Sequence, residues 1–417
     1  VGKSGIEKYY ESYLHGKDGI KVIEFDQEGN VVGSRMKVEP VPGCTVVLTL
    51  DSGLQKTAQE SLENRVRTIA ATCAKGKGAE ANAGSVVALN PQTGEILAAA
   101  TYPSYDLNQY YSNYNELSND NLKPLFNRAF NGAYAPGSTF KPCMGVAGLA
   151  SGTITPASTV NCQRVYQYLG MNFTCMHTHG NLTLQNALKV SCNIFFYDIG
   201  RRMGIDTICE YAAGFGLGEK TGLELPENIG RMASAQYRVS KGGKWYPGDV
   251  LQASIGQSDS MFSPLQMAVY TGTIGNNGVR MEAHLIKKIV SYDYETVVYE
   301  HQNTVLSTIE NKNNAFETVK NGMYLVSTQG TGRSAFGRYA FQVGSKTGSP
   351  ENYGNKAANA IFTAMGPLED CKLSVAAVIE YGFNGNKAAQ LVKEIFDKHF
   401  FVAEEHNTPT AENALLV

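Results

Sequence analysis

The sequence predicts an α+β fold with two lobes (an α/β two-lobed arrangement): an antiparallel sheet flanked by helices, with a helical lobe beside it. Strand-like segments occur at 85–101 and again at 339–382, far apart in the chain. Between them, helical periodicity dominates from residue 138 to about residue 335. Strands from both ends must share one sheet to bury their apolar faces, so the inserted helices are expected to form a second lobe. A cleft between sheet and lobe is the natural place for a functional site.

Composition and charge exclude several classes of protein. Hydrophobic residues make up 43% of the 417 residues and charged residues 18%, which is a globular and not a disordered composition. Lys and Arg number 36 against 38 Asp and Glu, so no general positive field attracts nucleic acid, and we expect none as a partner. No apolar run reaches the roughly 18 to 20 residues of a membrane span. Because the chain opens on Val1 and not on Met, we expect a processed or truncated product.

The first half of the chain supplies a linker, a helix and a hairpin. Residues 1–43 are short, polar and turn-rich, which predicts a pedestal or linker. From residue 51 to 73, apolar residues recur at steps of three and four, and Asp51 or Ser52 can cap this helix. SVVALN and EILAAAT flank a turn at 90–94, which predicts a buried hairpin. The Tyr- and Asn-rich stretch 102–134 is expected to be a long structured loop.

The end of the chain returns to strands and closes with a helix. Apolar strand patterns occur at 339–349, 357–367 and 372–382, with a short turn between the last two. From residue 388 to 400 the apolar residues again follow helical spacing.

Three short motifs with hydroxyl and amine groups occur in order along the chain. They are Ser138-Thr139-Phe140-Lys141, Ser191-Cys192-Asn193 and Lys346-Thr347-Gly348-Ser349. Each is weak by itself. Ser-x-x-Lys is expected about once or twice by chance in a chain of this length, and it recurs at Ser34 in a stretch without helical pattern.

The context of Ser138 sets it apart from the second copy. Pro136-Gly137 ends a loop, a helix follows, and a spacing of three puts Lys141 on the same helix face as Ser138. A serine hydroxyl needs a base beside it, and a lysine can serve if burial or a second cation lowers its pKa. Lys346 could be that cation. The alternative is a capping serine with a solvated lysine.

Other chemistries are less well supported. Lys-Thr-Gly also occurs at Lys220, in a Gly-rich loop that lacks the Gly before Lys that a phosphate-binding P-loop requires. There is no Gly-x-Ser-x-Gly elbow, and the seven histidines stand in no recognisable triad context. Nucleophilic chemistry based on serine and lysine remains.

Together the motifs resemble the class B penicillin-binding proteins, the monofunctional D,D-transpeptidases of peptidoglycan synthesis. The resemblance extends over nearly the whole chain and departs from the family at Ser258, where Gly is usual, and at Ser349, where Thr is commoner. The stretches that carry it are GIEKYYESYLHGKDG, LTLDSGLQ, VVALNPQTGEILAAATYPSYDLN, NRAFNGAYAPGSTFKP, VSCNIFFYDIG, GFGLGEKTGLELPEN, WYPGD with IGQSDSMFSPLQMA, and VGSKTGS.

The resemblance implies a domain organisation, a fold and a location. Residues 1–43 would be the remnant of an N-terminal pedestal, 44–403 the transpeptidase domain and 404–417 a C-terminal tail. The fold would be the penicillin-binding transpeptidase or β-lactamase-like one, with a five-stranded antiparallel sheet. The protein would lie on the extracytoplasmic face of the bacterial membrane, anchored by an N-terminal segment absent from this chain.

The resemblance also implies roles for the motif residues. Ser138 would attack the penultimate D-Ala carbonyl of a stem peptide, Lys141 would take its proton, and backbone N–H groups of Ser138 and Ser349 would stabilise the oxyanion. Ser191 and Asn193 would relay a proton and hold the substrate. The substrate's terminal carboxylate would be bound by Lys346, Thr347, Gly348 and Ser349. The expected partners are D-Ala-D-Ala stem peptides, β-lactams and a membrane glycosyltransferase.

Two other functions remain open. A β-lactamase or D,D-carboxypeptidase would resolve the acyl-enzyme with water, and Glu224, four residues before Asn228, superficially offers a base for that step. A non-catalytic β-lactam sensor or cell-wall scaffold is the second alternative, although a scaffold need not keep a base, a relay and an oxyanion strand together.

Four of the eight cysteines crowd between residues 143 and 192. Cys162, Cys175 and Cys192, with His179, offer three thiols and an imidazole, as in a closed tetrahedral zinc site. We favour His179 over His177 because the adjacent Gly180 lets the chain turn. The resemblance adds that some class B members carry zinc beside the active site. A disulfide between the first two cysteines and three unlinked thiols are the alternatives. The zinc would be structural, and the chemistry would need no cofactor.

Overall fold

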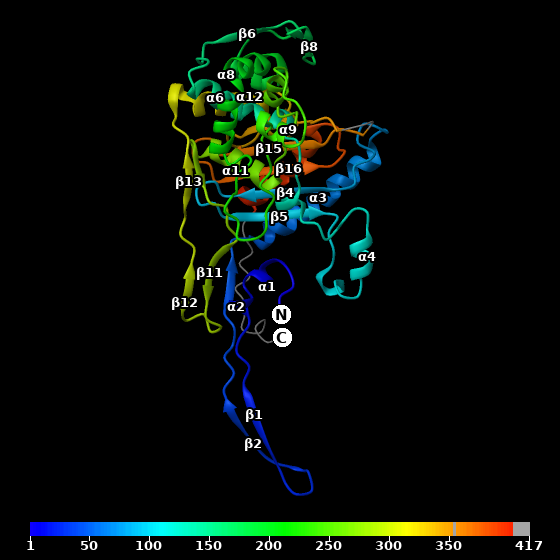
Figure 1. Ribbon diagram of the computed structural model, residues 1–417, viewed down its shortest axis with the longest axis vertical. Coiled ribbons are helices and arrows are strands. Elements are labelled where there is room, and N and C mark those ends of the chain that lie inside the picture. The colour runs from blue at the N-terminus through cyan, green and yellow to red at the C-terminus, as the bar shows by residue number, and fades with distance from the viewer. Residues whose placement is uncertain (353–355, 403–417) are drawn as a thin grey trace.

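A computed structural model describes residues 1–352 and 356–402. Figure 1 shows a long two-stranded extension below a larger body that contains the sheet and the helices. The expected C-terminal tail at 404–417 lies outside the described residues. No helix among the described residues is both long and apolar enough to cross a membrane.

The sheet has five strands that come from both ends of the chain. Its order is β14-β15-β16-β4-β5, and every neighbouring pair is antiparallel. The predicted antiparallel five-stranded sheet is therefore confirmed. The strands are β4 (Gly84–Leu89), β5 (Ile96–Tyr102), β14 (Gly344–Gly348), β15 (Ala360–Gly366) and β16 (Leu373–Ile379).

Helices cover both faces of this sheet, because successive side chains along a strand point to opposite sides. Val86 and Ala88 pack into one core with helices α3 (Ser52–Thr72), α13 (Arg333–Phe336) and α14 (Ala389–Phe401). Val87 and Leu89 face the other core, which includes α11 (Pro264–Gly275). Burial on both faces explains why β15 and β16 are apolar almost throughout.

The helical lobe is built around α6 (Lys141–Ala150), in which every residue is buried. Helices α8 and α12 pack against it. The other helices of this part of the chain are α7 (Leu184–Lys189), α8 (Asn193–Gly214), α9 (Ala235–Ser240), α10 (Asp249–Ser254) and α12 (Ala315–Gln329), with 3-10 turns η2 (Gly137–Phe140) and η3 (Lys312–Asn314).

The prediction that helices dominate residues 138–335 is only partly right, because short β-hairpins interrupt the lobe. Each of these strands has three to five residues and is at least partly exposed, too short for an alternating pattern to stand out. They are β6 (Thr159–Cys162), β7 (Val165–Tyr168), β8 (Met171–Thr174), β9 (Gly180–Thr183), β10 (Val279–Met281), β11 (Ile286–Val290), β12 (Val297–Glu300) and β13 (Val305–Thr308).

The N-terminal segment forms the extension and its junction with the body. Helices α1 (Gly5–Tyr9) and α2 (Glu11–Leu14) precede a hairpin of β1 (Ile20–Phe25) and β2 (Val31–Val38). Strand β3 (Thr45–Leu48) then pairs with β11, more than 230 residues later in the sequence. The expected loop at 102–134 contains η1 (Leu107–Gln109), α4 (Tyr114–Asn119) and α5 (Arg128–Asn131), and η4 (Gly385–Ala388) precedes the last helix.

The structure distinguishes the two capping candidates of α3. Asp51 is the N-cap residue, and its carboxylate accepts a hydrogen bond of 2.7 Å from the Leu54 N–H group. We expect Asp51→Ala to lower the free energy of unfolding by about 1 kcal/mol, because it leaves an N–H group of the first turn without its partner. Chemical denaturation measures this. Ser52→Ala is the matched control, and an equal loss in both variants would contradict the capping role.

Candidate functional site

Ser138 lies in the 3-10 turn that leads into α6, between the sheet and the helical lobe. Gly137 enters this turn with φ +54°, a backbone conformation that favours glycine. The hydroxyl of Thr139 donates to the Pro136 carbonyl at 2.7 Å and closes the turn. Ser138 is half-exposed, whereas Gly137 and Thr139 on either side of it are buried.

Tyr270 on α11 holds the junction between this turn and α6. Its hydroxyl donates to the Thr139 carbonyl at 3.1 Å and accepts from the Cys143 N–H group at 2.9 Å. Tyr270 belongs to none of the motifs that the sequence offers. A tyrosine in a largely apolar stretch was the available signal, because a buried phenol needs a hydrogen-bond partner.

Lys141 points from the start of α6 to the second motif. Its ammonium group donates to the Ser191 carbonyl at 2.7 Å and to Asn193 Oδ1 at 2.7 Å, and lies 3.3 Å from Ser191 Oγ. Ser191 has φ +53°, a left-handed conformation that costs a non-glycine residue on the order of 1 to 3 kcal/mol. The cluster therefore holds a strained backbone in place.

Lys346 reaches the same serine from the sheet. Its Nζ donates to Ser191 Oγ at 3.0 Å and to the Thr347 carbonyl at 3.1 Å. Lys346 lies in the middle of β14, within the strand pattern predicted at 339–349. The hydroxyl of Ser191 is thus shared by two lysines that come from different lobes.

Burial controls the charge of both lysines, whose side chains have no exposed surface. Burial lowers the pKa of Lys141 from 10.5 to about 8, with the neighbouring thiols of Cys175 and Cys192 acting in the opposite direction. Burial, and then the charge of Lys141, hold the pKa of Lys346 well below its ordinary value. The site therefore favours a neutral amine beside a charged one.

The third motif lies directly beside the turn that carries Ser138. A Cβ atom on Gly348 would lie 2.7 Å from the Pro136 carbonyl oxygen, so the strand can approach this closely only with glycine there. Thr347 shares a hydrogen bond of 2.7 Å with the hydroxyl of Thr331. The exposed Ser349 accepts a hydrogen bond from the Gly385 N–H group at 3.0 Å.

The second copies of two motifs lie elsewhere. Ser34 belongs to β2 on the extension. Lys220 is an exposed loop residue, and the hydroxyl of the adjacent Thr221 donates to Glu227 at 2.7 Å. Glu224 accepts hydrogen bonds from the backbone N–H groups of Leu285 and Ile286, so its carboxylate is engaged in holding the chain near β11.

The crowded cysteines and His179 converge behind the second motif. The ligand atoms of Cys162, Cys175, His179 and Cys192 all lie within 4.8 Å of one another. His179 Nδ1 is 3.4 Å from the Cys162 sulfur and 3.6 Å from the Cys175 sulfur. All eight cysteines are free thiols in the structure. His177, the other candidate, has an exposed side chain.

The two distances from His179 Nδ1 fit a tetrahedral metal ion. Zinc bound at about 2.3 Å from sulfur and about 2.0 to 2.1 Å from nitrogen would separate those ligands by about 3.5 Å. The N–H group of Asn193 also donates to the Cys175 sulfur at 3.3 Å, which favours a thiolate there. The cluster is therefore joined directly to the motif that holds Lys141.

Comparison with known families agrees with this geometry. A model of the penicillin-binding protein transpeptidase domain matches residues 84–397, which is well over half of the chain. The chain belongs to the penicillin-binding protein transpeptidase family. A model of the penicillin-binding protein dimerisation domain matches residues 1–48.

Individual relatives resemble this penicillin-binding protein over nearly its whole length. Peptidoglycan D,D-transpeptidase MrdA of Acinetobacter baumannii is 29% identical over 95% of the chain and 60% of the relative. MrdA of Escherichia coli K12 is 30% identical over 99% of the chain and 66% of the relative. A chain in a solved peptidoglycan synthase complex is 30% identical, with a TM-score of 0.87 over 98% of this chain and 71% of that one. The chain thus spans less than two thirds of these two curated relatives.

Proposed function

We propose that this protein is a serine D,D-transpeptidase that cross-links peptidoglycan stem peptides and is acylated by β-lactams. One observation carries the proposal: the Ser191 hydroxyl lies within hydrogen-bond distance of both buried lysines, Lys141 at 3.3 Å and Lys346 at 3.0 Å. Such a bridge can pass protons between a nucleophile's base and a leaving group. The family match and the relatives' names support the same chemistry.

In this proposal Ser138 is the nucleophile and neutral Lys141 its base. The Ser138 oxygen attacks the carbonyl of the penultimate D-Ala, and its proton passes to the Lys141 amine. The N–H groups of Ser138 and Ser349 stabilise the oxyanion, and one such donor is commonly worth about 100- to 1,000-fold in rate. The closeness of the Gly348 backbone to the Pro136 carbonyl supports the pairing of these two N–H groups.

Collapse of the tetrahedral intermediate breaks the peptide bond and forms the Ser138 ester. Ser191 delivers the proton to the departing D-Ala amine, and Asn193 holds Lys141 and the substrate amide. The terminal carboxylate lies against Lys346, Thr347 and Ser349. An amine from a second stem peptide then attacks the ester, which forms the cross-link and releases Ser138.

Hydrolysis by a β-lactamase-like route receives less support. The carboxylate of Glu224, the candidate base for water, accepts backbone hydrogen bonds from Leu285 and Ile286 instead. A non-catalytic scaffold would have no need for two buried lysines on one hydroxyl, since burying amines is unfavourable.

We further propose the setting in which the protein works. The peptidoglycan synthase complex that contains a similar chain supports a glycosyltransferase partner. The expected location is the extracytoplasmic face of the membrane, held by an N-terminal anchor outside this chain. The dimerisation-domain match at 1–48 supports a pedestal segment, proposed as 1–43, ahead of a transpeptidase domain at 44–403.

We also propose that Cys162, Cys175, His179 and Cys192 hold a structural zinc ion. Four protein ligands leave no open position for water, so the metal would not take part in the reaction. Bound there, it would fix the hairpin segments 159–183 to the start of α8, and so keep Ser191 and Asn193 against Lys141. The N–H···S contact between Asn193 and Cys175 supports this role.

Ser138→Ala is expected to abolish the covalent adduct with a fluorescent penicillin, because the attacking oxygen is removed. Intact-mass measurement detects the adduct, and Ser34→Ala is the matched control that should react normally. An adduct on the Ser138→Ala protein would show the assignment to be wrong. With the unaltered protein, a stable adduct together with a cross-linked product from two stem peptides supports the transpeptidase. A stable adduct with release of D-Ala but no cross-link indicates a D,D-carboxypeptidase, and a stable adduct with no reaction on stem peptides indicates a sensor. Rapid loss of the adduct indicates a lactamase, and its absence indicates a scaffold.

The acylation rate is expected to rise with pH around a midpoint of about 8. Lys141 must be neutral to accept the proton, and burial lowers its pKa from 10.5 to about 8, so the active form increases as pH rises through that value. Second-order rates of β-lactam acylation across pH measure this. A rate that stays flat between about pH 6 and 9, or falls there, would contradict Lys141 as the base.

Protein purified without added metal is expected to contain about one zinc per chain by elemental analysis. Cys162→Ser should lose most of it because one of four ligands is missing, whereas Cys44→Ser, outside the cluster, should retain it. Zinc well below one equivalent, with a non-reduced mass lower by two hydrogens, would favour the Cys162–Cys175 disulfide and exclude the metal site.

A further inference from the structure

The backbone just before Ser138 is held by the segment 256–262. Gly137 donates its N–H group to the Gly256 carbonyl at 2.9 Å, and Tyr134 and Phe262 exchange two backbone hydrogen bonds of 2.9 Å. A Cβ atom on Gly256 would lie 2.2 Å from the Gly137 carbonyl oxygen, so the two backbones are in direct contact. The position of this segment therefore determines the position of the turn that carries Ser138.

Ser258, in the middle of this segment, has an unfavourable backbone conformation. Its φ is +66°, in the left-handed region that glycine adopts freely and serine does not. It is also where the sequence departs from the glycine that is usual in the family. A strained residue of this kind persists only where its surroundings hold it, and such residues cluster at functional sites.

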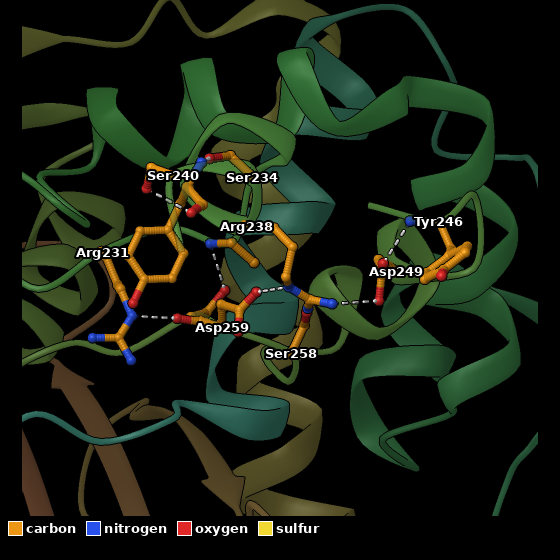
Figure 2. A network of polar contacts seen from close by, with 11 residues as sticks. Arg231, Ser234, Arg238, Ser240, Tyr246, Asp249, Ser258 and Asp259 are labelled. Atoms are coloured by element: carbon orange, nitrogen blue, oxygen red, sulfur yellow. Dashed lines mark hydrogen bonds and ion pairs between the residues drawn. The ribbon is translucent and has the colours of Figure 1, made fainter. Parts of the chain in front are cut away.

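Arg238 on α9 provides those surroundings, as Figure 2 shows. Its Nη2 donates to Ser258 Oγ at 2.9 Å, and its Nε donates to the carboxylate of the next residue, Asp259. Its Nη1 lies 3.5 Å from Asp249 Oδ1 on α10, and its guanidinium lies over the Trp245 ring at 5.6 Å. The Arg238, Asp249 and Asp259 side chains are only 25, 18 and 23% exposed, so water weakens these contacts little.

We propose that Arg238 is a positioning residue for the acylation step. It holds Ser258 in its left-handed conformation and, through Gly256, fixes the direction in which Gly137 presents Ser138 to the substrate. The inference rests on the proposed function, because it needs Ser138 to be the nucleophile.

The shape of the side chain matters as much as its charge. Three nitrogens of the planar guanidinium face Ser258, Asp259 and Asp249 at once. A lysine ammonium carries the same charge but has no such fork, so it cannot replace these contacts together.

The test measures β-lactam acylation and separates the binding constant of the noncovalent complex from its rate of conversion to the adduct. Arg238→Ala is expected to lower the conversion rate at least about 10-fold with little change in binding, because a misplaced nucleophile slows the chemical step. Arg238→Lys should be slowed as well. Ser258→Gly should react normally, because glycine needs no support at positive φ.

The double variant is decisive. Arg238→Ala with Ser258→Gly is expected to recover most of the lost conversion rate, because glycine keeps the segment in place without Arg238. Because glycine at this position also relieves backbone strain, thermal denaturation of each variant separates a recovered conversion rate from a recovered stability. Arg67→Ala, which removes an exposed arginine paired with Glu63 on α3, is the control and should react normally.

Three outcomes would overturn the proposal. The first is a normal conversion rate in Arg238→Ala, and the second is a double variant that converts as slowly as Arg238→Ala. The third is a normal conversion rate in Arg238→Lys together with weaker noncovalent binding of the β-lactam in Arg238→Ala. If the unaltered protein forms no adduct, the proposed function fails and this inference fails with it. If the unaltered protein forms the adduct and the Arg238 variants convert at the same rate as it does, only this inference fails.

Discussion

The site depends on two lysine amines that share one serine hydroxyl in a buried space. Lys141 comes from the helical lobe and Lys346 from the sheet, and both donate to Ser191 Oγ. Two buried ammonium groups this close repel each other and lose hydration, so one amine is pushed toward its neutral form. This arrangement makes a base available, and it also requires the two lobes to remain fixed relative to each other. If they moved apart, one lysine amine would stay buried without its hydrogen bond to the Ser191 hydroxyl.

The topology of the sheet supplies this rigidity. Strand β14 is an edge strand, and its neighbours β15 and β16 link it to β4 and β5 from the other end of the chain. Lys346 pairs in register with Thr363 on β15, and both strands are buried throughout. The outer edge of β14 is therefore free to face the turn of Ser138, while the rest of the sheet holds its register.

Residues with strained backbone conformations, and glycines, occur near the turn that carries Ser138, where backbone segments come into direct contact. Ser191 and Ser258 both have positive φ, and each accepts a hydrogen bond from a basic side chain. Gly256 and Gly348 permit contacts with the turn that a Cβ atom would block. The cluster of three cysteines and His179 contacts the Ser191 motif, because the N–H group of Asn193 donates to the Cys175 sulfur. The geometry at Ser138 is thus fixed by its surroundings and not by the motif residues alone.

The sequence alone predicted the sheet assembled from distant strands, the helix capped near Asp51, the three motifs and the grouping of three cysteines with His179, because periodicity and residue spacing encode them. It could not determine that Lys346 reaches Ser191, that Tyr270 holds the nucleophile turn, or that Arg238 contacts Ser258. It also missed the hairpins of the helical lobe, whose strands are too short to show a period. Those features depend on contacts between residues far apart in the chain, and only tertiary packing decides which side chains meet and which charges lose water.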